Sequence, residues 1–113
     1  MSKFDIAKLF EKSDLIPTII QCADTKSVLM MAYMNAESLQ KSLDTRQTYF
    51  YSRSRKTLWL KGETSGHYQQ IVDVYADCDN DTLLITVNQT GVACHTGEMS
   101  CFYTKISEDL QDE

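Results

Sequence analysis

Apolar runs along the chain predict mostly short strands. Residues 18–23 and 28–33 are rich in β-branched and apolar side chains and flank a polar tetrad, which predicts a hairpin. The run at 28–34 is apolar throughout, so we expect it to be a central strand buried on both faces. Later apolar runs predict further strands at residues 48–52, 67–76, 82–89 and 102–106.

Helical spacing occurs twice. Residues 4–12 carry a stripe of apolar side chains, with Ser2 as a candidate cap, and predict a short N-terminal helix. Asn35 is placed to cap a second helix over residues 36–43. The chain shows no internal repeat and no linker. We therefore expect one α+β domain over residues 1–113, with two short helices and a mostly antiparallel sheet of five or six strands.

Composition narrows the class of protein. The chain is 42% hydrophobic and 24% charged, as in ordinary globular domains, and its formal charge of -5 argues against a nucleic-acid-binding surface. No apolar run reaches the roughly 18 residues that span a bilayer. Residues 1–10 carry Lys and Asp where a signal peptide would be apolar, so we expect no membrane partner and a cytoplasmic location. Residues 1–14 would form the N-terminal helix and lead-in, and residues 107–113 an acidic tail.

An acidic stretch at residues 77–81 places three carboxylates and a thiol within five residues. In an extended backbone, Asp77, Asp79 and Asp81 would share one face. Cys78 would point to the other. Three carboxylates together favour a hard cation such as Mg2+, whereas a thiolate favours a softer one. The alternative is an acidic hairpin turn beside a buried cysteine, because Asn and Asp are common in turns.

Three cysteines lie late in the chain: Cys78, Cys94 and Cys101. Three thiolates and an open fourth position form a catalytic type of zinc site. Their spacing contains no Cys-x-x-Cys pair, so isolated buried cysteines remain the alternative. His95 directly follows Cys94 and is a candidate general acid or base, the alternative being a merely exposed histidine. Cys22 and His67 receive no role.

Basic side chains concentrate in the middle of this acidic chain. Together with nearby hydroxyls they could bind a phosphate, and the alternative is a solvated basic strand. The candidate substrate-binding residues are Arg53, Arg55, Lys61, Thr64 and Ser65.

Five motifs follow one another along the chain: VLMMAYMN (28–35), SRSR followed by LW (52–59), KGETSG (61–66), DCDND (77–81) and ACHTG leading to SCF (93–102). Together, and in this order, they resemble the phosphoribosyl-AMP cyclohydrolase family. The resemblance runs from about Leu15 to Tyr103. Three positions depart from the residues usual in the family: Cys22 stands where the family has Asp, Tyr51 where it has Trp, and His67 where it has Asn.

The resemblance implies hydrolytic opening of the purine ring of phosphoribosyl-AMP between N1 and C6, the third step of histidine biosynthesis. It also implies a homodimer with active sites at the subunit interface, so that the zinc ligands could come from both subunits. By the same resemblance, the zinc ligands are Cys78, Cys94 and Cys101, and the magnesium ligands are Asp77, Asp79 and Asp81.

Two other classes stay open. A zinc-dependent deaminase-like nucleotide hydrolase would release ammonia, although the His-x-Glu and Pro-Cys-x-x-Cys motifs of nucleobase deaminases do not occur here. A non-catalytic module stabilised by zinc would need a closed shell of four ligands, whereas only three clustered cysteines are present.

Overall fold

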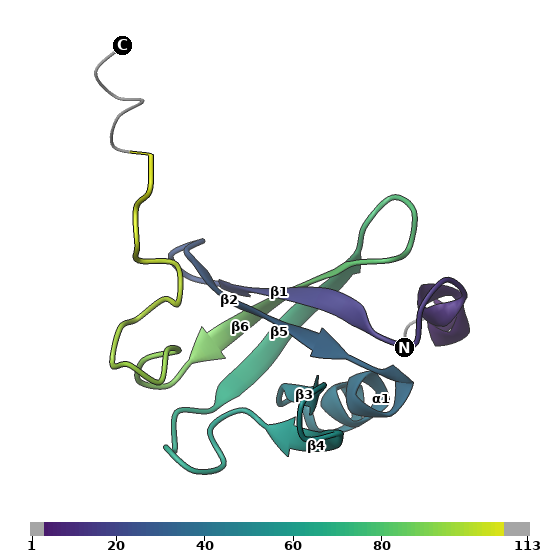
Figure 1. The fold of residues 1–113 in the computed structure, drawn as a ribbon, viewed down its shortest axis with the longest axis horizontal. Coiled ribbons are helices and arrows are strands. Elements are labelled where there is room, and N and C mark those ends of the chain that lie inside the picture. The colour runs from purple at the N-terminus through teal and green to yellow at the C-terminus, as the bar shows by residue number, and fades with distance from the viewer. Residues whose placement is uncertain (1–3, 108–113) are drawn as a thin grey trace.

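The computed structural model describes residues 4–107, which form one small α+β domain with a four-stranded sheet, a two-stranded sheet and one α-helix (Figure 1). No helix within the described range is long and apolar enough to cross a membrane. In chain order the elements are the 3-10 helix η1 (Ile6–Phe10), β1 (Ile16–Cys22), β2 (Val28–Met34), α1 (Ala36–Thr45), β3 (Tyr49–Ser52), β4 (Thr57–Leu60), β5 (Gln69–Ala76) and β6 (Leu83–Gln89).

The larger sheet has the strand order β2-β1-β6-β5. The predicted β1–β2 hairpin is confirmed, and β5 and β6 also pair antiparallel, but β1 and β6 run parallel. Residues directly opposite one another share a face of a sheet. One cross-strand row, which we call the apolar belt, therefore lies on a single face and consists of Met31, Ile19, Leu84 and Tyr75. The adjacent row points into the core on the other face and includes Met30, Ile20 and Ile85.

Strand β2 lies at an edge of the sheet, so the prediction of a central strand was wrong. The strand is apolar on both faces, for a different reason on each face. The side chains on one face are buried in the core, whereas Met31 on the other face belongs to the apolar belt and is 42% exposed. The segment after β6 forms hydrogen bonds with the unpaired backbone edge of β2. The Cys101 N–H donates to the Leu29 carbonyl at 2.7 Å, and the Ser100 hydroxyl donates to the Val28 carbonyl at 2.7 Å. These bonds cover part of an otherwise unpaired edge.

Helix α1 begins as predicted and ends later than predicted. The Asn35 side chain accepts from the Ser38 N–H, and the Ser38 hydroxyl accepts from the Asn35 N–H, which is a capping box. The helix continues to Thr45 because Arg46 takes a left-handed conformation and donates its N–H to the Ser42 carbonyl. Leu39 is buried and packs the helix into the core.

The remaining differences lie near the two ends and in one missed strand. Near the N-terminus a short 3-10 helix replaces the predicted longer helix, and Asp5 caps it. Ser2, the predicted cap, lies outside the described residues. Residues 102–106 do not form the predicted last strand, and residues 108–113 of the predicted acidic tail also lie outside the described range. Strand β4 was missed because its four residues are too few to show a period.

Candidate functional site

The acidic residues 77–81 form the turn that joins β5 to β6. The Asn80 N–H donates to the Asp77 carbonyl at 3.1 Å, and Asn80 has a φ of 58°. The Asp77 Oδ1 atom accepts from the N–H groups of Asp81 and Thr82, at 3.0 and 3.2 Å. The expected extended stretch with alternating faces is therefore wrong, because Asp and Asn side chains close tight turns by bonding to nearby backbone.

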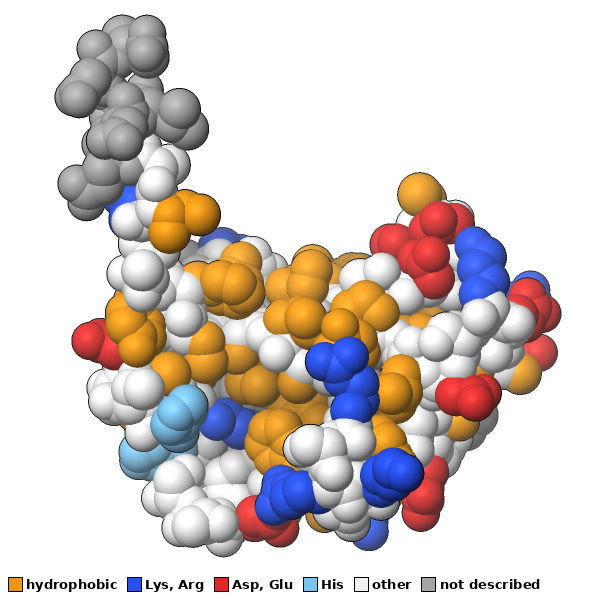
Figure 2. Space-filling model, viewed as in Figure 1, with side chains coloured by type: hydrophobic (Ala, Val, Ile, Leu, Met, Phe, Trp, Pro, Cys, Tyr) orange, Lys and Arg blue, Asp and Glu red, His pale blue; other side chains and the backbone are white. Residues whose placement is uncertain are grey.

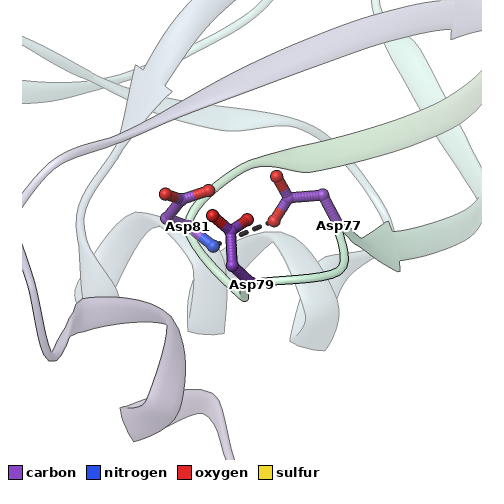
Figure 3. A group of neighbouring side chains, drawn as sticks. All are labelled: Asp77, Asp79 and Asp81. Atoms are coloured by element: carbon purple, nitrogen blue, oxygen red, sulfur yellow. Dashed lines mark hydrogen bonds between the residues drawn. The ribbon is translucent and has the colours of Figure 1, made fainter.

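The turn nevertheless gathers the carboxylates of Asp77, Asp79 and Asp81 (Figure 3). One oxygen of each lies within 4.8 Å of the other two. The hydrogen bond from the Asp81 N–H lowers the pKa of Asp77, whereas desolvation and then the two neighbouring carboxylates raise the pKa of Asp81. Lys12 Nζ lies 3.9 Å from Asp81 Oδ2, but this exposed pair contributes little. A divalent cation that takes these carboxylate oxygens as ligands would offset the repulsion between the three negative charges.

Two of the predicted zinc ligands, Cys94 and Cys101, meet beyond the other end of β6. The Thr96 hydroxyl lies 3.0 Å from Cys94 Sγ and lowers the pKa of the Cys94 thiol. Burial, and then the interaction with Cys94, raises the pKa of the Cys101 thiol. The Cys101 side chain also helps to lower the pKa of the Cys94 thiol. A lowered pKa favours the thiolate, which is the form that binds a metal.

Lys61 connects this thiol pair to the two-stranded sheet. Its Nζ donates to the Ala93 carbonyl at 2.5 Å, across 32 residues of sequence, and its backbone N–H donates to the Thr48 carbonyl at 3.0 Å. After Thr96, the positive charge of Lys61 also contributes to the lowered pKa of Cys94. The fold thus places the positively charged Lys61 ammonium group near the Cys94 and Cys101 thiols.

A cavity of about 390 Å³ opens next to Cys94. Both histidines of the chain line it, and Figure 2 shows their side chains in pale blue beside an apolar hollow. The structure thus brings the candidate acid or base His95 to the same cavity as Cys94. Four of the five candidate substrate-binding residues also line the cavity: Arg55, Lys61, Thr64 and Ser65.

The fifth candidate, Arg53, lies elsewhere. Its guanidinium Cζ is 4.2 Å from the centre of the Tyr33 ring, on strand β2. Trp59 lines the cavity but also packs against the buried Phe50, with ring centroids 5.0 Å apart. Trp59 is therefore partly a core residue.

Cys78 is separated from the other two predicted zinc ligands. It is exposed in the β5–β6 turn, whereas Cys94 and Cys101 lie beyond the opposite end of β6 (Figure 1). A strand of this length spans about 20 Å, whereas thiolates that share a zinc ion lie about 4 Å apart. Within residues 4–107, the carboxylates of Asp77, Asp79 and Asp81 form the only group of three or more candidate metal ligands. One copy of the chain therefore does not bring its three cysteines to one ion.

Comparison with known proteins places these features in a family. The family model described as phosphoribosyl-AMP cyclohydrolase matches residues 30–103. The chain is a member of the phosphoribosyl-AMP cyclohydrolase family. This confirms the resemblance seen in the five motifs and the prediction of an enzyme of this family.

Similar phosphoribosyl-AMP cyclohydrolases come from several bacteria. The one from Bacillus cytotoxicus is 60% identical over 92 residues, covering 81% of this chain and 91% of the relative. The one from Roseobacter denitrificans is 50% identical over 112 residues, covering 98% and 88%. The one from Acidiphilium cryptum is 53% identical over 107 residues, covering 95% and 92%. The similarity therefore extends over most of each protein.

Two residues that contribute to the candidate site were not predicted from the sequence. Thr96 lowers the pKa of the Cys94 thiol, and its position only two residues after Cys94 could have indicated this contact. Tyr33 contacts Arg53 across 20 positions (53 − 33), and no local pattern in the sequence indicates this contact.

Proposed function

We propose that this chain hydrolyses phosphoribosyl-AMP by opening its purine ring between N1 and C6, in histidine biosynthesis. Beside family membership, one observation carries the proposal: Cys94, His95 and Lys61 meet at a single cavity. In the reaction, the oxygen of water bonds to C6 and becomes the carboxamide oxygen. The C6–N1 bond breaks, and N1 leaves with a proton.

The residues of this chain fit two metals. Cys94 and Cys101 would hold zinc together with Cys78, since the two thiols are neighbours and the pKa of the Cys94 thiol is lowered towards the metal-binding form. Asp77, Asp79 and Asp81 would hold magnesium, since their oxygens already converge. Zinc, when bound, lowers the pKa of a coordinated water towards neutrality.

A homodimer would complete the zinc site. Two copies in opposite orientation could bring Cys78 of the partner subunit to Cys94 and Cys101, and the reverse contact would form a second site. The apolar belt supports such an assembly, because Met31 and Tyr75 are 42% and 53% exposed. The acidic turn of the partner subunit would then reach the same cavity, because Cys78 is part of that turn.

His95 would move the protons of the reaction. It is exposed at the rim of the cavity, where its imidazole can take a proton from the attacking water and return one to N1. The cations Arg55 and Lys61 and the hydroxyls of Thr64 and Ser65 would bind the anionic phosphates of the substrate.

The test of the function is incubation of the purified protein with Zn2+, Mg2+ and phosphoribosyl-AMP, followed by ultraviolet absorbance and an ammonia assay. Turnover without ammonia supports ring opening. Release of ammonia would instead support the deaminase-like hydrolase. Absence of turnover with zinc bound would contradict both activities and favour a zinc-stabilised module.

The role of His95 has a matched control in His67, because both imidazoles line the cavity. We expect His95→Ala to lower kcat by about a hundredfold or more, as for loss of a general acid or base. His67→Asn should have a much smaller effect. Near-normal turnover by His95→Ala with zinc still bound would remove His95 from the mechanism.

A further inference from the structure

Arg53 differs from the other basic residues of the candidate site in how it is held. Its guanidinium lies over the Tyr33 ring, with Cζ 4.2 Å from the ring centre. This is well within the roughly 6 Å over which a cation is attracted to an aromatic face. The two residues come from different elements, since Tyr33 is on β2 and Arg53 is in the turn after β3. The contact therefore joins the small sheet to the large one.

The turn between β3 and β4 is itself fixed at its base by Ser52. The Lys56 N–H donates to the Ser52 carbonyl at 2.8 Å, and the Arg55 N–H donates to the Ser52 hydroxyl at 3.2 Å. Arg55 lines the cavity, whereas Arg53 lies on Tyr33. The β3–β4 turn thus directs the Arg55 guanidinium towards the cavity and the Arg53 guanidinium towards Tyr33 on β2.

The charge of this turn is not neutralised within the described chain. The one ion pair found within residues 4–107 joins Lys12 and Asp81, so neither Arg53 nor Arg55 pairs with a carboxylate there. The Tyr33 ring contacts the guanidinium of Arg53 but accepts no hydrogen bond from its N–H groups in the described part of the chain. The planar fork of Arg53 donors therefore stays available, and such a fork matches two oxygens of a phosphate.

We propose that Tyr33 is a positioning residue for phosphate binding. Its ring orients the Arg53 guanidinium so that the donor edge meets one phosphate of the substrate outside the cavity, while Arg55 and Lys61 bind the other phosphate inside the cavity. The inference rests on the proposed function for the identity of the substrate. The ring face performs this role, and the Tyr33 hydroxyl is not needed for it.

The test compares Tyr33→Leu with Tyr33→Phe, and it has a control on the same fold. Lys41 Nζ lies 5.1 Å from the Tyr49 ring, a second cation–ring contact between α1 and β3. We expect Tyr33→Leu to raise the KM for phosphoribosyl-AMP about two- to fivefold, with kcat unchanged. Tyr33→Phe should match the wild type, and Tyr49→Leu should leave KM unchanged.

A double-mutant cycle separates positioning from a general structural effect. In an Arg53→Ala background, Tyr33→Leu should have no further effect on KM, because the group that it positions is gone. Three results would overturn the inference: additive effects of the two changes, equal damage by Tyr33→Phe, or an equal rise in KM with Tyr49→Leu. If Tyr33→Leu does not fold, Tyr33→Met removes the ring while keeping a flexible apolar side chain.

The test also distinguishes this inference from the proposed function. Titration calorimetry with inorganic pyrophosphate measures anion binding without turnover. Binding about two- to fivefold weaker in Tyr33→Leu than in wild type would support the role of Tyr33 even if phosphoribosyl-AMP were not hydrolysed. Equal binding by the two proteins, together with normal turnover, would contradict the role of Tyr33 alone.

Discussion

The two ends of the four-stranded sheet carry different metal-ligating side chains and are built differently. At the β5–β6 turn, three carboxylates lie within five residues, and the Asp77 carboxylate accepts hydrogen bonds from N–H groups four and five residues along the chain. At the other end, the segment carrying Cys94 and Cys101 is held across 32 positions by Lys61 and across 72 by Ser100. The acidic end is thus a local structure, whereas the thiol end depends on the whole fold.

The largest expected effect tests whether the two ends meet in a dimer. Cys78→Ala and Cys94→Ala should each lower turnover at least about a thousandfold, because each removes a zinc ligand. Unfolding and refolding equal amounts together should restore about a quarter of wild-type activity. Half of the random dimers are heterodimers, and each of these has one intact site. The measurement is turnover with the zinc content of each sample.

The control for this mixture uses two changes at the same end. Cys94→Ala and Cys101→Ala should not restore activity when mixed, since every shared site then lacks one thiol. Lack of recovery in both mixtures, with heterodimers present, would contradict a zinc site shared between subunits.

A second prediction concerns the buried polar contacts beneath the thiol end. Gln69 is fully buried; its Oε1 accepts from the Thr48 hydroxyl and its Nε2 donates to Gln89 Oε1, both at 2.8 Å. Gln69→Leu removes the partner of the Thr48 hydroxyl and of the Gln89 Oε1 atom, and it should lower the free energy of unfolding by about 3 kcal/mol. The matched change Gln70→Leu, at an exposed neighbour, should cost less than about 0.5 kcal/mol. Chemical denaturation measures both, and similar losses would contradict this account.

A third prediction concerns the loop that follows β6. Gly91 has a φ of 70°, and a Cβ there would come within 2.5 Å of the His67 ring. Gly91→Ala should therefore lower the free energy of unfolding by about 2 to 3 kcal/mol. Gly97→Ala is the control, because Gly97 also has a positive φ but a Cβ there would meet nothing within 4 Å. It should cost about 1 kcal/mol, from the backbone alone.

The contact with His67 can be isolated by removing the ring. In a His67→Ala background, the cost of Gly91→Ala should fall to that of Gly97→Ala. An unchanged cost would mean that the backbone, and not the close approach of the imidazole, makes glycine necessary at this position.

The smallest expected effect is at the acidic end. The Asp81 N–H holds the pKa of Asp77 below its unfolded value, so the stability that Asp77 contributes is present above the unfolded pKa and is lost as the pH falls through the folded pKa. Asp77→Asn keeps an acceptor but carries no charge. In metal-free protein, the wild type should melt at a higher temperature than this variant near neutral pH, and the difference should disappear in acid. A constant difference in Tm would contradict this.

The local parts of the fold were predictable from the sequence. The β1–β2 hairpin and the start of α1 at its Asn35 cap follow from patterns within a few residues. The edge position of β2 was not predictable. An apolar strand has the same sequence pattern whether its second face is buried in a core or forms part of an exposed apolar belt. The parallel pairing of β1 with β6 joins strands more than 60 residues apart (83 − 18 = 65) and leaves no local pattern.

By itself, the sequence determined the inventory of the site and its family. It supplied the three carboxylates in one short segment, the late cysteines, and His95 beside Cys94. Only the tertiary structure decided which of these meet. The three carboxylates converge because residues 77–81 form one tight turn, which local hydrogen bonds close. Cys94 and Cys101 come together with Lys61 through long-range hydrogen bonds, whereas the length of β6 holds Cys78 away from them. Side chains distant in sequence are placed by strand pairing and packing, which depend on the whole chain at once.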